Sequence, residues 1–133
     1  MNRKTARENA FILIFEKNFR ADSIESIIED AIEARNFEYD EYVEAVFKGV
    51  FDNIEKIDKL ISDNLHGWKL ARLSKVAVSL LRLAVFEILF MEDIPVSVSI
   101  NEAVEIAKKY STQDDASYIN GVLGSIAKNT EVR

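Results

Sequence analysis

The sequence contains no cysteine and only one histidine, one proline and four glycines in 133 residues. The absence of cysteine excludes a disulfide framework, a thiolate metal site and a thiol nucleophile, and it fits a reducing compartment, by default the cytoplasm. The single histidine, His66, has no neighbouring acid at metal-ligand spacing. We therefore expect no metal site in this protein.

Long apolar runs are also missing. The longest apolar region, residues 76–91, is interrupted by Arg82 and Glu87, whereas a membrane span needs roughly 20 apolar residues in a row. Early charges such as Arg3 and Lys4 break up any signal-peptide pattern. The sequence therefore predicts a soluble, intracellular protein that does not enter a membrane.

Because glycine and proline are scarce and apolar residues recur at helical spacing, the sequence predicts an all-α protein of about seven helices. Side chains able to accept hydrogen bonds from the first amides mark several helix starts. These are Asp22 or Ser23, Asp40, Asp52 or Asn53, Ser74, and a residue between 112 and 114. Ser99 and Glu102, three residues apart, predict a capping box at the start of the sixth helix.

A boundary is expected at His66-Gly67-Trp68, because a glycine just after a helical pattern is a common left-handed terminator. We predict one compact domain over residues 1–133, made of two packed helical sub-bundles at roughly residues 1–66 and 67–133. In the second sub-bundle, the helix that starts at Lys75 is apolar nearly all round, which is typical of a buried central helix.

For catalysis the sequence offers little. The acidic pairs Glu102/Glu105 and Asp114/Asp115 lack the pocket context that acid–base chemistry requires. No nucleotide-binding loop motif is present either. We predict a protein that is not an enzyme.

Charge is distributed unevenly along the chain. The net charge is -6, which by itself argues against a nucleic-acid ligand. Residues 1–20 carry +3, residues 22–63 carry -9, residues 64–91 carry +3 and the remainder carries -3. A polyanion can therefore approach a basic part while the acidic segment faces away or meets a basic protein.

Two groups of residues are candidates for contact with RNA. Arg3, Lys4 and Arg7 lie along one edge of the first helix and can contact successive phosphates; the alternative is a solvated positive terminus. Tyr118 lies beside a buried stripe on the last helix and either stacks on an unpaired base or packs at the helix edge. Asp114, on the same helix, also fits a first-turn acid favoured by the helix dipole.

Arg82 and Glu87 interrupt a helix that otherwise reads as buried, and buried charges need partners. Because these two residues are five positions apart, they do not face each other directly. Glu102 is a candidate partner for Arg82. We predict a structural charge network of Arg82, Glu87 and Glu102 that joins the last three helices.

Four segments together carry a resemblance to a known family. They are RKTARE at residues 3–8, LRLAVFE at 81–87, INEA at 100–103 and YINGVL at 118–123. With these segments the chain resembles the NusB family of bacterial transcription antitermination factors, over nearly its whole length and most strongly across residues 81–123. The resemblance implies an all-α fold and no cofactor.

The resemblance also implies an RNA site. NusB-like proteins contact the boxA element of RNA through an arginine-rich N-terminal motif, which Arg3, Lys4 and Arg7 match here in a shorter and less basic form. Tyr118 matches an aromatic position beside the RNA path, and Asp114 matches an acidic position near the RNA and the partner surface. The predicted RNA site consists of Arg3, Lys4, Arg7, Lys108, Asp114 and Tyr118.

Two further positions concern a protein partner. In NusB-like proteins an aromatic residue at the position of Phe15 faces the small-subunit ribosomal protein NusE; core packing is the alternative for Phe15. The helix of Ala77 faces the same partner, but relatives commonly carry an acidic residue there, so we expect the contact to differ. The implied role is to pair with NusE, clamp single-stranded boxA-like RNA and keep the elongating RNA polymerase resistant to termination.

Two rival functions stay open at this point. NusB-like domains also occur on ribosomal-RNA cytosine methyltransferases, of which this chain would be a fragment. A purely structural helical dimerisation module is the third alternative. The sequence leaves both a monomer and a homodimer open.

Overall fold

A computed structural model describes residues 1–129, and within them the chain forms seven α-helices and one short 3₁₀ helix, with no strand. The elements are α1 (Arg3–Lys17), α2 (Ile24–Arg35), α3 (Glu41–Asp52), α4 (Ile54–Asp63), η1 (Leu70–Arg72), α5 (Lys75–Phe90), α6 (Val96–Tyr110) and α7 (Gln113–Asn129). The predicted all-α class is confirmed. The last four residues of the predicted domain, 130–133, lie outside the described part.

Most helix starts coincide with the predicted caps. The side chains of Ser23, Asp40, Ser74 and Thr112 each accept a hydrogen bond from the backbone N–H three residues later, at 2.9 to 3.1 Å. Gly67 has the expected left-handed φ, +80°, but α4 ends before it, at Asp63, so the glycine turns the connection rather than terminating the helix. Local side-chain chemistry therefore sets where these helices begin.

The predicted capping box on the sixth helix is wrong. Helix α6 begins at Val96, directly after Pro95, whose φ of -59° suits a helix start. Ser99 lies in the first turns of α6 and is fully buried, and its hydroxyl donates a hydrogen bond to Glu87 rather than capping the helix. The three-residue spacing of Ser99 and Glu102 thus places both on one face of a continuing helix.

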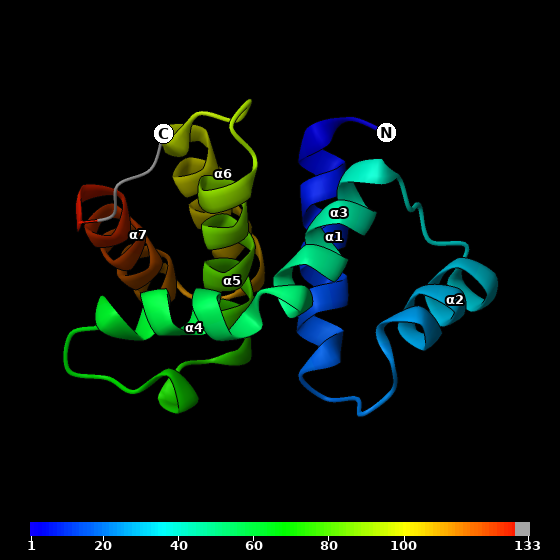
Figure 1. The fold of residues 1–133 in the computed structure, drawn as a ribbon, viewed down its shortest axis with the longest axis horizontal. Coiled ribbons are helices and arrows are strands. Elements are labelled where there is room, and N and C mark those ends of the chain that lie inside the picture. Colours follow the sequence, from blue (N-terminus) through cyan, green and yellow to red (C-terminus); the bar gives the residue numbers. More distant parts are fainter. Residues whose placement is uncertain (130–133) are drawn as a thin grey trace.

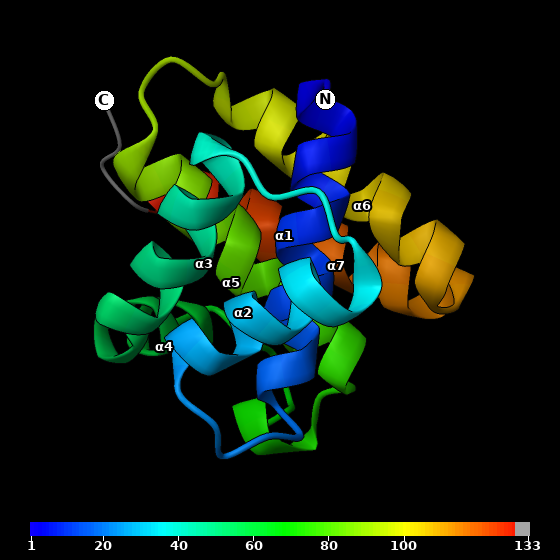
Figure 2. The same ribbon diagram turned by 90° about the vertical axis from the view of Figure 1, so that its right-hand side faces the viewer.

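Helix α5 occupies the centre of the molecule. It contacts α1, α3, α4, α6 and α7, and most of its side chains are buried, as predicted for a helix that is apolar nearly all round. Figure 1 shows α1 to α3 on one side of α5 and α7 on the other, with α4 running across beneath α5 and α6 overlapping it in this view. Figure 2 shows α2 packed across the outer side of α1.

The helices do not gather in space as the two halves predicted at residues 66 and 67. Helix α4 packs on α5 and α7, so the division falls between α3 and α4, at Asn53. The reason is that α4, whose buried face carries Ile57 and Ile61, makes most of its contacts with α5 and α7. The Gly67 turn only returns the chain from α4 to α5.

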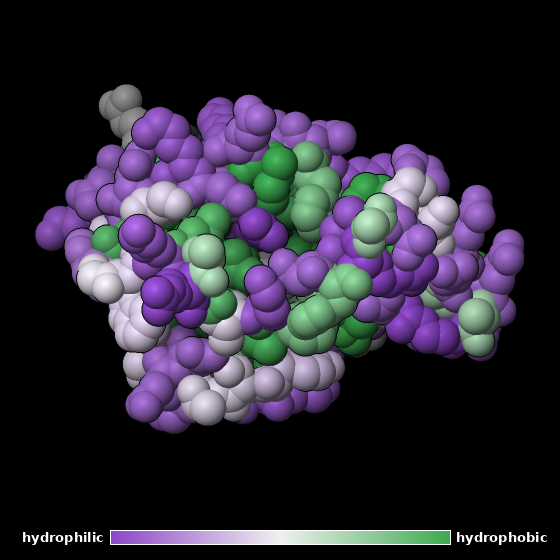
Figure 3. Space-filling model, turned by 90° about the horizontal axis from the view of Figure 1, so that it is seen from below, coloured by the Kyte–Doolittle hydropathy of each residue, from purple (hydrophilic) through white to green (hydrophobic). Residues whose placement is uncertain are grey.

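One hydrophobic core joins side chains from all seven helices of the described part. Seen from below, Figure 3 shows apolar side chains gathered in the middle of the molecule with polar side chains around them. The end of α1 and the connection from α4 to α5 lie at this underside (Figure 1). Among residues 1–129, no helix has both the length and the apolar character needed to cross a membrane.

Candidate functional site

The carboxylate of Glu87 on α5 is a buried meeting point of four helices. The Arg7 guanidinium of α1 donates from Nε to Oε2 of Glu87 at 2.7 Å, with side chains that are 3% and 0% exposed. The hydroxyl of Tyr42 on α3 donates to the same oxygen, and the hydroxyl of Ser99 on α6 donates to Oε1 at 2.7 Å. We call these four residues the Glu87 cluster.

The cluster keeps a fixed pattern of charge and protons. Burial alone lowers the pKa of Arg7, but the hydrogen bond and the charge of Glu87 raise it further than burial lowers it. Burial raises the pKa of Tyr42, and the charge of Glu87 raises it further. Arg7 therefore stays charged and Tyr42 stays protonated, so both remain donors to the carboxylate. A buried carboxylate is stable when it is paired and hydrogen-bonded in this way.

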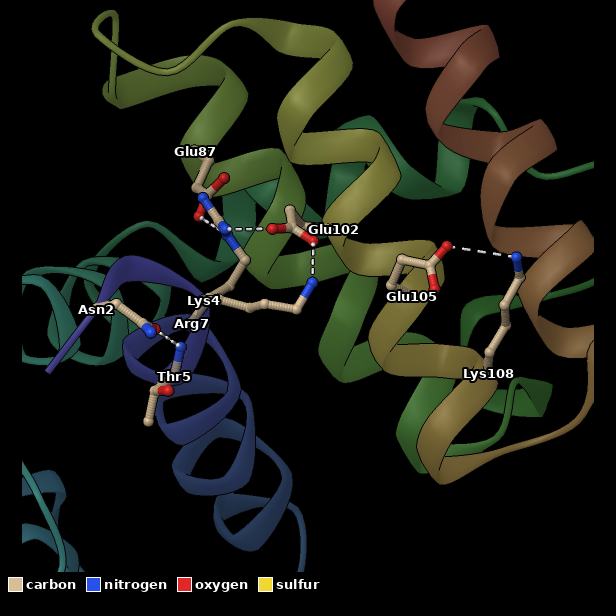
Figure 4. A network of polar contacts seen from close by, with 8 residues as sticks. All are labelled: Asn2, Lys4, Thr5, Arg7, Glu87, Glu102, Glu105 and Lys108. Carbon is tan, nitrogen blue, oxygen red and sulfur yellow. Dashed lines mark hydrogen bonds and ion pairs between the residues drawn. The ribbon is translucent and has the colours of Figure 1, made fainter.

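A chain of contacts leads from the Glu87 cluster to the surface (Figure 4). Arg7 Nη1 lies 3.5 Å from Glu102 on α6, and the other Glu102 oxygen lies 3.5 Å from Lys4 Nζ. The Lys4 side chain is 74% exposed. Its neighbour Arg3 lies with its guanidinium 4.5 Å from the centre of the Tyr42 ring. Through these contacts, the cluster holds the exposed side chains of Arg3 and Lys4 in position.

Arg7 is not part of the exposed basic edge, which corrects the prediction of three aligned cations. Its residue surface is 2% exposed, because position 7 shares a helix face with buried Ala10 and Ile14, three and seven residues later. Arg3 and Lys4 are exposed as predicted. In this structure only these two residues of the motif are open to a phosphate.

Arg82 is paired with Asp58 and not with Glu102, which corrects the predicted network. Its Nε and Nη2 donate to the two carboxylate oxygens of Asp58 on α4, both at 2.9 Å. Five residues along a helix turn the side chain by about 140°, so Arg82 and Glu87 face different neighbours. The structure therefore has two separate charge pairs on α5 in place of one network. Glu87 and Glu102 do share a partner, Arg7.

The remaining predicted RNA residues are spread over α6 and α7. Lys108 is exposed, with Nζ 3.4 Å from Glu105. Asp114 is exposed at the start of α7. Tyr118 is half-buried and packs against the core, and its hydroxyl lies in the interior without a hydrogen-bond partner among the described residues.

Five of the six predicted RNA residues, all except Arg3, line one of three hollows. The α1–α6 hollow is lined by Lys4, Arg7, Glu8, Glu102, Glu105, Ile106 and Lys109. The α6–α7 hollow is lined by Asn101, Val104, Glu105, Lys108, Gln113, Ala116, Ser117 and Asn120. The Trp68 hollow is lined by Trp68, Arg72, Leu73, Ser74, Asp114, Asp115 and Tyr118. Lys4 and Tyr118 are therefore not brought into one pocket, although Glu105 borders the first two hollows.

Glu8 ties α1 to the end of α6. It accepts a hydrogen bond from Tyr110 and forms an ion pair with Lys109, each at 2.6 Å. Burial by itself raises the pKa of Glu8, and the bonds from Lys109 and Tyr110 lower it overall. These contacts therefore hold the wall of the α1–α6 hollow in place at neutral pH.

The two predicted partner positions differ in exposure. Phe15 is half-buried in a row of rings on α1 and the turn that follows it. Its ring centre lies 5.9 Å from that of Phe11 and 5.1 Å from that of the exposed Phe19, which comes after the end of α1. Ala77 is 1% exposed, because it begins the buried stripe of α5 that Leu80 and Leu81 continue. The prediction that the Ala77 side chain contacts a partner is therefore wrong, because this side chain is buried.

Sequence reasoning missed several partners. One pairing could have been predicted. Arg7 lies on the buried stripe of α1, and a basic residue at such a position indicates a buried acidic partner, here Glu87. Asp58 and Tyr42 gave no local signal, because their roles depend on how distant helices pack. Within residues 1–129, no group of three potential ligands is placed to hold a metal ion.

This chain is similar to known proteins over nearly its whole length. Residues 4–128 match the NusB family. The chain is 46% identical to the transcription antitermination protein NusB of Natranaerobius thermophilus, with 96% of this chain and 95% of that protein covered. It is 41% identical to the same-named protein of Clostridium acetobutylicum, with 98% of each covered.

Two solved structures have folds similar to that of this chain. NusB of T. maritima is similar with a TM-score of 0.86 and 38% identity, covering 97% of this chain and 92% of that chain. A chain in a crystal structure of the antitermination factors NusB and NusE in complex with double-stranded RNA is similar with a TM-score of 0.86 and 27% identity. That match covers 96% of this chain and 97% of that chain.

Proposed function

The chain belongs to the NusB family, and we propose that it is a transcription antitermination factor that binds RNA together with the ribosomal protein NusE. The observation that carries this proposal is the match over full length: 98% of the C. acetobutylicum relative is covered at 41% identity. The likeness to a chain solved with NusE and RNA supports the two partners. Its relatives are named for antitermination rather than for a reaction, so the protein is not an enzyme.

The two rival functions have less support. The relatives from N. thermophilus and C. acetobutylicum are antitermination proteins that this chain covers over 95% and 98% of their own lengths. No observation favours a purely structural dimerisation module. The antitermination factor is therefore the function that the comparisons and the geometry support together.

For RNA, we propose a first contact at the start of α1, on Arg3 and Lys4, with Lys109 of α6 in the same hollow as Lys4 and Lys108 in the adjoining α6–α7 hollow. These four side chains are exposed, whereas Arg7 lies in the Glu87 cluster beneath them. Because Arg7 and Glu102 tie α1 to α5 and α6, the phosphate contacts are ordered before RNA arrives. An interface ordered in advance loses less entropy on binding. The RNA would be single-stranded and boxA-like, as the family resemblance implies.

For NusE, we propose the row of rings on α1 and the turn that follows it, at the underside. Phe19 is exposed and packs edge-on against Phe15. Exposed aromatic side chains are enriched at protein interfaces. The assembly would act on the elongating RNA polymerase, in the cytoplasm.

The RNA contact can be tested by fluorescence anisotropy with labelled boxA-like and scrambled single strands at several salt concentrations. We expect the double substitution Arg3→Ala and Lys4→Ala to weaken binding. It should also flatten the dependence of log K on log salt by about 0.7 for each phosphate that the variant no longer neutralises. A matched control, Lys48→Ala with Lys59→Ala, removes the same charge from α3 and α4 and should leave the slope unchanged. Equal effects of the two variants would contradict the proposed contact.

A further inference from the structure

Among the described residues, the most exposed large apolar side chain stands on a tightly held turn. Phe19 is 63% exposed and comes two residues after the end of α1. The backbone N–H of Phe19 donates to the carbonyl of Glu16 at 2.9 Å, and that of Arg20 donates to the carbonyl of Lys17 at 3.5 Å. An exposed ring adds little to the core, so the contacts that hold this turn call for another explanation.

Asn18 anchors the turn to the central helix. Its side-chain amide donates to the carbonyls of Phe15, at 3.1 Å, and Ile14, at 3.4 Å, both on α1. The same amide donates to Oγ of Ser79 on α5 at 3.0 Å. Ser79 is fully buried. Asn18 thus joins the end of α1, which carries Phe15, to α5 directly before the chain reaches Phe19.

The other side of the turn is held by weaker contacts. Arg20 contacts Asp22 and Asp30 of α2, each at 2.6 Å, and these acidic side chains are 50% and 59% exposed. Exposed ion pairs of this kind are screened by water and salt and contribute little. The bond from Asn18 to buried Ser79 is shielded from solvent. We therefore expect this bond to set the position of the turn.

The place of this bond indicates what it is for. Phe15 and Phe19 pack edge-on, with ring centres 5.1 Å apart, on the two sides of Asn18 in the sequence. We propose that Asn18 and Ser79 are positioning residues of the partner surface, whose hydrogen bond holds both rings in the one arrangement that NusE meets. Aromatic anchors carry much of the energy of protein interfaces, and an anchor ordered in advance loses less entropy on binding. This inference rests on the proposed function, because it concerns the surface proposed for NusE.

The chain offers a matched control at the end of α4. There the side-chain amide of Asn64 donates to the carbonyl of Leu60 at 2.9 Å, and its Oδ1 accepts from the hydroxyl of Ser125 on α7 at 2.9 Å. An asparagine after a helix end is thus again joined through a serine to another helix. This second pair lies across α5 from the end of α1 (Figure 1), away from the row of rings.

The test compares the two serines. The Kd of NusE for the full chain is measured by isothermal titration calorimetry for the wild type, Ser79→Ala and Ser125→Ala. We expect Ser79→Ala to weaken NusE binding about fivefold, the factor that one hydrogen bond is typically worth. Ser125→Ala should leave it unchanged. Melting curves check that both variants are folded, and the RNA affinity of the chain alone should be the same in all three proteins.

A double-mutant cycle separates positioning from a general structural role. Phe19→Ala removes the ring that the bond positions and should itself weaken NusE binding. In the Phe19→Ala background, Ser79→Ala should therefore cost little further affinity. Asn18→Ala tests the same bond from its other end, and combining it with Ser79→Ala should weaken NusE binding no more than Asn18→Ala alone.

The outcomes separate this inference from the proposed function. If Ser79→Ala binds NusE as tightly as the wild type, or loses as much affinity in the Phe19→Ala background as in the wild type, the inference is overturned while the proposed function stands. An equal loss in Ser125→Ala overturns it as well, because the effect is then not confined to the ring surface. If the wild-type chain does not bind NusE, the proposed function fails and this inference fails with it.

Discussion

At the scale of single residues, the carboxylate of Glu87 decides how the rest of the site is arranged. Removing Arg7 leaves this carboxylate buried with no opposing charge, so we expect Arg7→Leu to lower the free energy of unfolding by about 3–5 kcal/mol. Arg82→Leu removes the partner of Asp58, which is 25% exposed and can be hydrated. We expect a loss of about 1–2 kcal/mol there.

Urea unfolding of both variants gives the comparison. The Arg7 variant should unfold at clearly lower urea than the Arg82 variant. An Arg7 variant as stable as the Arg82 variant would mean that Glu87 does not depend on its buried partner.

The hydroxyl of Tyr42 adds a pH dependence. Burial first, and the charge of Glu87 second, raise the pKa of Tyr42 above its ordinary value of 10.0. A group with a higher pKa in the folded state stabilises the fold fully below its unfolded pKa, and this stabilisation is lost as the pH rises above that value. We expect the free energy of unfolding to fall above about pH 10, and to fall less in Tyr42→Phe.

Unfolding in urea at a series of pH values between 7 and 11 tests this. The Tyr42→Phe variant should start about 1–2 kcal/mol lower at neutral pH, because the carboxylate loses a donor. Tyr39 and Tyr110 contribute equally to both proteins. Parallel curves would show that another group titrates.

The sequence alone predicted only some of these residue-level contacts. It indicated that Glu87 and Arg82 are charges in a buried helix, since both interrupt an apolar run. It assigned the wrong partner to Arg82 and an exposed role to Arg7, because the true pairs join α5 to α4 and to α1 across the fold. Such pairs depend on helix packing, which local spacing does not encode.

At the scale of elements, the close crossing of α3 and α5 depends on one glycine. A Cβ added at Gly49 would lie 2.3 Å from the ring of Phe86. We expect Gly49→Ala to destabilise the protein by about 1–3 kcal/mol, because the packed ring must move. In α7, a Cβ at Gly121 meets nothing within 4 Å, so Gly121→Ala should stabilise it by about 0.5–1 kcal/mol.

Thermal melting of the two variants provides the check. The two changes are chemically identical and both lie within helices, so their helix propensities gain equally. Opposite shifts of Tm are expected. A Gly49→Ala variant that melts above the wild type would show that α3 and α5 do not cross at this distance.

Element boundaries were predictable where the capping chemistry is local. Ser23, Asp40 and Ser74 mark their helices by side chains that satisfy the first amides. The prediction failed at α6, where a buried serine and a glutamate at capping-box spacing serve a tertiary hydrogen bond and an ion pair instead. The correct signal was Pro95, which ends the loop and starts the helix.

At the scale of the whole molecule, the distribution of charge changes meaning once the pairs are known. Two segments of equal charge, residues 1–20 and 64–91, appeared equivalent in the sequence. In the structure, Arg7 and Arg20 of the first are paired with acids, whereas Lys69, Arg72 and Lys75 of the second are open. The sequence could not predict this, because pairing depends on which helices meet.

The central claim is that this chain binds RNA jointly with NusE, and joint binding is a measurable coupling. The most direct measurement is the Kd of a labelled boxA-like single strand for the chain alone, for NusE alone and for the equimolar pair, at one fixed salt concentration. If the two proteins complete one RNA surface, the pair should bind at least about fivefold more tightly than either protein alone, the lower range of typical coupling between sites. An affinity of the pair no higher than that of the better single protein would contradict the account.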